Sequence, residues 1–319
     1  MAVVTGVGTT WTLPNFAGEL FTADPTSTPL LTMIGGMTGG MVSDNAEFAT
    51  NQLFSYPDPE QPKISEQASA VAPAARSIAR IQEKNVCQIH QLTTDLSYHK
   101  LANKGRMSGL NTAGQAPNPN DELAFQIKNS LLIPTARDIE YSFINGAYHS
   151  STSVSDASTT RGMLPLCTGT SEINAIGDDL DFAMLQSLYK KMADNGAYFS
   201  NMVMFVGAGL KQKVTEIYGD KNGINLPTSR TAAGINITSI MTDFSMINVV
   251  WNKFMPSNAV LICDIGFLSP VFLEVPNKGV MFVEELAKLG AGERRQLYGE
   301  VGLAHGPAFL HGSIINIGA

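Results

Sequence analysis

The strongest chemical signal in this sequence is the glycine-rich turn Gly207-Ala208-Gly209, which lies between a predicted buried strand and a predicted helix. A turn of this kind begins the phosphate-binding fingerprint of dinucleotide-binding folds, in which a third glycine follows. That third position is Gln212 here, and no convincing strand–helix–strand unit precedes the turn. We therefore interpret the turn as structural. A cytosolic α/β nucleotide-binding enzyme remains the alternative from a different functional class.

The other residues with catalytic or metal-binding potential form no recognised motif. The chain contains no His-Glu-x-x-His pair, no Gly-x-Ser-x-Gly elbow and no phosphate loop ending in Gly-Lys-Ser/Thr. Asp178, Asp179 and Asp181 lie close together, but they precede a predicted helix whose positive end favours acids. We expect no catalytic residue, no metal ion and no cofactor. The five histidines, expected to be structural or exposed, are His90, His99, His149, His305 and His311.

Composition indicates a protein that hides much of its surface in contacts. Charged residues make up 15% of the 319 residues, against about 25% in typical soluble proteins. Obligate interfaces are depleted in charge in this way, so we expect an oligomer. The net charge of −7 argues against sequence-independent nucleic-acid binding. No apolar run approaches the roughly 18 residues of a membrane span.

The chain shows no sign of export. Its N-terminus lacks the basic start of a signal peptide. Cys87, Cys167 and Cys263 are odd in number and form no Cys-x-x-Cys pair, so we expect reduced structural thiols in a cytosolic product.

The first 44 residues are interpreted as an N-terminal arm. No lysine or arginine occurs before Lys63, and large apolar residues such as Trp11, Phe16 and Leu20 are scattered without periodicity. A segment of this kind cannot bury its apolar side chains against itself. It must lie on the rest of its own chain or on a neighbour.

Residues 45–93 predict a long two-stranded loop that projects from the body, because polar residues occupy both strand parities from Ile78 to Thr93 and such a strand is seldom in the centre of a domain. Phe54 and Tyr56 share one strand parity, and the prolines that follow stop any ladder because proline lacks the donor N–H. Isolated ribbons are marginally stable in water, so this one should rest on an adjacent subunit. The residues expected to contact a neighbour are Trp11, Phe16, Leu20, Phe54, Tyr56, Pro57, Pro59 and Pro62.

The rest of the chain alternates helical and extended patterns. Residues 120–148 predict a long helix that Pro134 should kink or split. The Ser/Thr run 150–160 predicts a mobile loop, and an apolar stripe flanked by acids and lysines predicts a helix over 178–194. Further elements are predicted at 202–206 (strand), 208–218 (helix), and 246–251, 259–263, 271–275, 279–283 and 309–317 (all extended).

This order of parts resembles the Hong Kong 97-type major capsid protein of tailed double-stranded DNA bacteriophages. The stretch from Asn15 to Leu20, continued by Thr28 to Gly35, is similar to the arm of one branch of these proteins. The stretch from Leu297 to Ile315 is similar to that branch's last strands. The likeness spans essentially the whole chain.

The resemblance implies an α+β fold with five parts. These are an N-terminal arm (1–44), an extended loop (45–93), a peripheral domain (94–175) with a spine helix near 120–148, an axial α/β domain (176–275) and the peripheral domain's return strands (276–319).

The resemblance also implies a function. The chain would be a structural virion protein, not an enzyme, that assembles in the host bacterial cytoplasm through hexamers and pentamers into an icosahedral head. The head would enclose double-stranded DNA without sequence-specific binding and without a membrane. The implied partners are a separate scaffolding protein, a portal and, as an optional addition, a decoration protein. An encapsulin-like nanocompartment shell protein is the alternative within the same fold.

Overall fold

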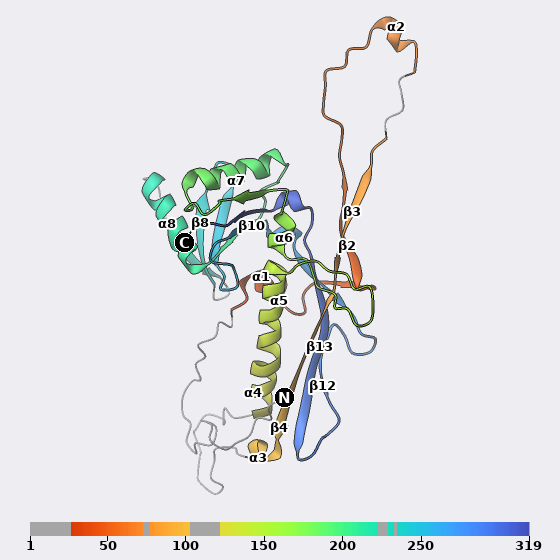
Figure 1. The fold of residues 1–319 in the computed structure, drawn as a ribbon, viewed down its shortest axis with the longest axis vertical. Helices are drawn as coiled ribbons and strands as arrows, with labels where there is room; N and C mark the ends of the chain where they lie inside the picture. The colour runs from red at the N-terminus through yellow and green to blue at the C-terminus, as the bar shows by residue number, and fades with distance from the viewer. Residues whose placement is uncertain (1–26, 73–76, 103–121, 223–228, 233–234, 319) are drawn as a thin grey trace.

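The computed structural model of this chain describes residues 27–72, 77–102, 122–222, 229–232 and 235–318. Within these ranges the strands form three sheets, of five, seven and two strands. Figure 1 shows a body built around the two larger sheets, from which the two-stranded ribbon projects as a long extension. The fold is a mixture of helices and strands, as the predicted α+β class requires.

Strand β13 is the centre of the five-stranded sheet. β4 and β12 both pair antiparallel with residues 295–299 of β13, so they lie on opposite sides of it. β11 pairs with residues 300–304 on the β12 side, and β1 adds a parallel strand beyond β11. The bounds are β1 (Met41–Ser43), β4 (Gln88–Ser97), β11 (Ser269–Leu273), β12 (Met281–Glu285) and β13 (Gly292–Ala304).

A long helical run lies along this sheet (Figure 1). It consists of α4 (Glu122–Gln126), a π-helical stretch (Ile127–Leu132) and α5 (Ile133–Asn145). The wide π turns precede Pro134. Proline has no backbone N–H to donate, and in a regular α-helix its ring would collide with the carbonyl group of the preceding turn. The predicted long helix is thus confirmed over 122–145, and residues 120–121 of the prediction lie outside the described residues. The predicted end at residue 148 is wrong, because Gly146 adopts an extended conformation and ends the helix.

The seven-stranded sheet is covered on both faces. Met204 and Val206 of β6 pack with α7 and α8, whereas Val203 and Phe205 pack with α1, α5 and α6. Two-sided burial explains why β6 and residues 260–263 of β10 are continuously apolar rather than alternating. The sheet order is β5 (Glu172–Asn174), β14 (Gly312–Ile315), β10 (Val260–Asp264), β6 (Met202–Val206), β9 (Met246–Trp251), β8 (Ile235–Met241) and β7 (Ser229–Ala232).

The two helices on this sheet were both predicted, with different ends. α7 covers Phe182–Asp194 and begins later than residue 178, because the Asp181 side chain accepts the N–H of Met184 and caps the helix there. α8 covers Ala208–Asn222 and extends past residue 218. The remaining short helices are α1 (Pro29–Met33), α2 (Glu66–Ser69), α3 (Tyr98–Ala102), α6 (Met163–Cys167) and the 3₁₀ turns Ile265–Phe267 and Ala308–Leu310.

The ribbon consists of β2 (Glu47–Phe54) and β3 (Arg80–Val86), paired antiparallel, and of the described residues that connect them (55–72 and 77–79), which include α2. A bulge at Thr50 interrupts the pairing close to the body, where Ala49 and Asn51 face consecutive residues of β3. The predicted loop end at residue 93 is wrong, because β4 starts at Gln88 and pairs with β13 in the five-stranded sheet. Polar side chains on both parities suggested a ribbon, but β4 is instead covered on one face by the long helix.

Candidate assembly surfaces

The far half of the ribbon exposes apolar side chains that no other described residue covers. Phe54 is 55% exposed and Tyr56 is 72% exposed, and their rings meet edge to face at 5.4 Å. Pro57, Pro59 and Pro62 follow in an extended, fully exposed segment without secondary structure. The structure therefore brings these five predicted contact residues together. The other three, Trp11, Phe16 and Leu20, lie outside the described residues.

The root of the ribbon, in contrast, is firmly attached to the body. The buried Asn85 amide donates to the Leu303 carbonyl at 2.8 Å, and its oxygen accepts the N–H of Arg161 at 2.8 Å. A side chain at Gly302 would lie 2.7 Å from the Phe48 ring and from the Val86 carbonyl oxygen. Glycine at this position lets the ribbon root lie directly on β13.

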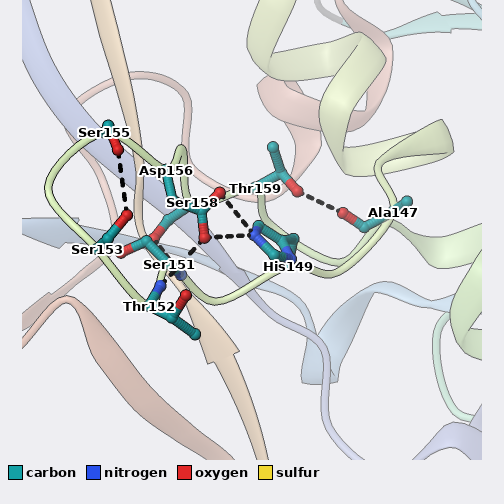
Figure 2. A network of polar contacts seen from close by, with 9 residues as sticks. All are labelled: Ala147, His149, Ser151, Thr152, Ser153, Ser155, Asp156, Ser158 and Thr159. Carbon is teal, nitrogen blue, oxygen red and sulfur yellow. Dashed lines mark hydrogen bonds and ion pairs between the residues drawn. The ribbon is translucent and has the colours of Figure 1, made fainter.

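Beside the root lies a serine- and threonine-rich loop with a closed hydrogen-bond network (Figure 2). His149 Nε2 lies 2.9 and 2.8 Å from the two carboxylate oxygens of Asp156, which also accepts the N–H of Thr152. This histidine contact is the main cause that lowers the pKa of the Asp156 carboxyl. Backbone bonds pair His149 with Thr159. Residues 150–160 form a loop without helix or strand, as composition predicts, and its own side chains link its two halves.

The same loop is braced against the ribbon. The Tyr148 hydroxyl donates to Glu47 at 3.4 Å, and the Arg161 guanidinium lies 4.7 Å from the centre of the Tyr148 ring. Because Arg161 also bonds Asn85, the loop and the ribbon root form one connected unit.

The described part of the arm, residues 27–44, is anchored by a buried carboxylate. Glu140 of α5 has no solvent exposure, and its oxygens accept the N–H groups of Leu30 at 2.9 Å and Leu31 at 2.7 Å and the amide of Asn252. Burial raises the pKa of the Glu140 carboxyl, and these hydrogen bonds oppose the rise. Leu30 and Leu31 fill the core shared by both large sheets. Sequence reasoning missed Glu140, although an acid beside Ile139 in an apolar stripe was a usable signal.

The remaining chemical candidates have structural explanations. Gly207 links the end of β6 to the start of α8, so the strand-to-helix turn is confirmed. Among the described residues no three His, Cys, Asp or Glu side chains gather as a metal site would require. Nor does any helix in the described ranges have the length and hydropathy of a membrane span. Cys87, Cys167 and Cys263 are buried free thiols.

A projecting ribbon, a long helix along a small sheet and a separate α/β sheet define the Hong Kong 97 class of shell-forming capsid folds. Known structures support this. A structure of Mycobacterium phage Bobi has 13% identity and a TM-score of 0.58, with 94% of each chain covered. The capsid of the native GTA particle has 16% identity and a TM-score of 0.55, with both chains fully covered. The holo-SrpI encapsulin complex of Synechococcus elongatus PCC 7942 has 12% identity and a TM-score of 0.56, covering 94% of this chain and 92% of that one.

The fold alone gives the class of protein, whereas a match in sequence shows the family. The model of the SU10 major capsid protein matches residues 3–318, and the chain belongs to this family. No curated protein matches the chain in sequence. The protein is therefore a structural component of a virion capsid and not an enzyme. The encapsulin likeness is one of fold alone, and the nucleotide-binding alternative is excluded by the family.

Proposed function

We propose that copies of this chain join through the ribbon, whose outer half lies on an adjacent copy within rings of six and of five subunits. These rings close into an icosahedral head around double-stranded DNA. The observation that carries the proposal is the contrast within the ribbon: a root fixed to β13 and an outer half with exposed aromatic rings. Such a ribbon gains its missing burial from a neighbour.

The energy available from the ribbon is substantial. Full burial of a large apolar side chain contributes about 1.5–3 kcal/mol, and since Phe54 and Tyr56 are 55% and 72% exposed, their remaining burial offers about 2–4 kcal/mol together. The extended proline segment adds contact area with little further loss of conformational freedom, because proline fixes φ in advance. Trp11, Phe16 and Leu20 of the N-terminal arm would add a second contact with a neighbouring copy.

In this proposal the predicted parts keep their roles but not all their bounds, because β11, predicted as axial, lies in the five-stranded sheet, and β14, predicted as a peripheral return strand, lies in the seven-stranded sheet. The five-stranded sheet and the long helix serve as the peripheral domain, with 122–145 as its spine helix, and the seven-stranded sheet serves as the axial domain around the ring axis. A separate scaffolding protein guides assembly in the host cytoplasm, a portal occupies one vertex, and a decoration protein is an optional outer partner. The DNA is enclosed without sequence-specific contacts, which suits the acidic chain.

Deletion of residues 57–75 tests the proposal. The shortened chain should keep the far-ultraviolet circular dichroism expected of the body but form no closed shells by electron microscopy and sedimentation. A second variant with the same residues replaced by a Gly/Ser segment of equal length separates loss of apolar contacts from loss of length. Both are compared with the wild-type chain under conditions in which it assembles. Closed shells from either variant at wild-type yield would overturn the proposal.

A further inference from the structure

The seven-stranded sheet carries two unlike surfaces at its opposite ends. β9 runs from Met246 to Trp251 beside the parallel strand β6, so the residues before these strands lie at one end and the residues after them at the other. Six residues of β9 separate the two ends by about 17 Å, at roughly 3.3 Å per residue. We call the first the aromatic end and the second the lysine end.

The aromatic end has the β8–β9 turn, which holds Asp243 and Phe244, as its most prominent part. Asp243 is exposed, and Phe244 is 46% exposed while stacking on Phe199 at 5.2 Å. Phe199 has a φ of 52°, which bulky residues rarely adopt and which recurs where function requires it. Next to it, Tyr198 is 68% exposed and lies 6.2 Å from Phe267. Exposed aromatic groups held by unusual backbone indicate a contact surface.

The lysine end is hollow. A cavity of about 590 Å³ opens there between the first turn of α8 and the loop after β9, with Trp251 and Lys253 on its rim and Leu180 and Met255 among its lining residues. Lys253 makes no ion pair or hydrogen bond with any other described residue. Lys213 also lines the cavity but is paired with Glu216 at 3.7 Å, and Asp179 contributes one opposing charge.

None of the described residues fills this hollow. A side chain at Gly209 would meet no atom within 4 Å, so the glycine there is not required by local packing. The first N–H groups of α8 point toward the cavity end of the sheet and add positive potential. The cavity thus suits an occupant with one negative charge and one flat apolar group.

We propose that the Asp243–Phe244 turn of one copy enters the Lys253 cavity of the next copy. The carboxylate of Asp243 pairs with Lys253, and the Phe244 ring covers Trp251 and the apolar lining. This inference rests on the proposed ring assembly and names the surfaces that join the axial domains within it. The occupant is a second copy because the same chain offers both the acidic aromatic turn and the cationic apolar cavity.

The placement of the two surfaces determines the kind of assembly. Unlike patches on opposite sides of one domain give a head-to-tail interface, which forms a ring when the rotation closes. A two-fold dimer would instead need one self-complementary patch. Opposite charges at the contact set the partner and register, whereas the aromatic contact supplies most of the burial.

The test uses charge exchange in the full-length chain. Asp243→Lys and Lys253→Glu each place like charges at the contact and should raise the concentration needed for ring formation by at least about tenfold, equivalent to about 1.4 kcal/mol. The double variant Asp243→Lys/Lys253→Glu should assemble as the wild-type chain does. An equimolar mixture of the single variants should also form even-membered rings, because each altered turn then meets an altered cavity. Analytical ultracentrifugation and electron microscopy measure the rings.

A matched control lies on the exposed face of α7. Lys190→Glu makes the same charge change as Lys253→Glu outside both surfaces and should leave assembly unchanged. If the single variants assemble as well as this control, or if the double variant and the mixture stay as defective as the single variants, the pairing is wrong. Shells from the wild-type chain in the same experiment would show that the proposed function survives that result. A wild-type chain that never assembles would instead count against the proposed function.

Discussion

Replacing Glu140 by glutamine should release the part of the arm that contains Leu30 and Leu31. The carboxylate accepts from two backbone N–H groups and one amide with no solvent nearby. Glutamine has the same shape but turns an NH₂ group toward one of these donors. A buried donor left without an acceptor costs about 1–3 kcal/mol, and a donor facing a donor adds to this, so we expect a loss of about 3 kcal/mol. Alanine should cost more, because it also opens a cavity.

Urea unfolding of the unassembled chain measures this loss. With a slope of about 3 kcal/mol/M, the midpoint should fall by about 1 M. Limited proteolysis should also cut near Leu30 and Leu31 in the variant before it cuts the wild-type chain, because the N–H groups that hold this segment lose their acceptor. Glu66→Gln, at an exposed helix start on the ribbon, is the control. A Glu140→Gln midpoint within about 0.2 M of this control would refute the reasoning.

Three further outcomes are expected. Gly302→Ala should lower the unfolding free energy by about 1–3 kcal/mol through overpacking at the ribbon root, measured by urea unfolding, and an unchanged midpoint would contradict the close contact. Burial lowers the pKa of His90 and His311 to about 4, so the unfolded chain binds more protons below about 6.5 and stability should fall as the pH drops from about 6.5 to about 4. Thermal unfolding across that range checks this, and a flat profile would count against two buried neutral rings. The double variant Phe54→Ser/Tyr56→Ser should leave the thermal midpoint of the unassembled chain unchanged but reduce the yield of closed shells at least tenfold. A wild-type yield of shells would show that these two rings stay exposed in the assembly.

Sequence reasoning succeeded where one local pattern decides the outcome. The 3.6-residue stripe with acids before it and lysines near its end defined α7, and only the side-chain cap at Asp181 fixed its first residue. The continuous apolar run of β6 identified a strand buried on both faces. The order of parts identified the fold class, because each part follows from periodicity and from the positions of proline and glycine.

Sequence reasoning failed where contacts between residues far apart in the sequence determine the structure. β4 was assigned to the ribbon because its polar residues occupy both parities, and only its pairing with β13, about 200 residues away, places it in the sheet. The role of Glu140 could not be predicted, because it depends on the N–H groups of Leu30 and Leu31, which lie 110 and 109 residues earlier. The loop around Asp156 shows a related limit at short range: its Ser/Thr-rich composition predicts a loop, but not the contact between His149 and Asp156 that links its two halves.

The bulge at Thr50 gives the ribbon a hinge close to its fixed root. A bulge leaves one residue outside the ladder and bends its strand, so it is the most compliant point between the body and the exposed aromatic rings. From there the outer half extends about 50 Å, at roughly 3.3 Å per residue over fifteen residues. A swing of about 5° at that pivot moves the far end by about 4 Å, by the same strand geometry. One unchanged polypeptide can therefore adapt its reach to neighbours set at different angles, as the differing curvature of a closed polyhedron demands.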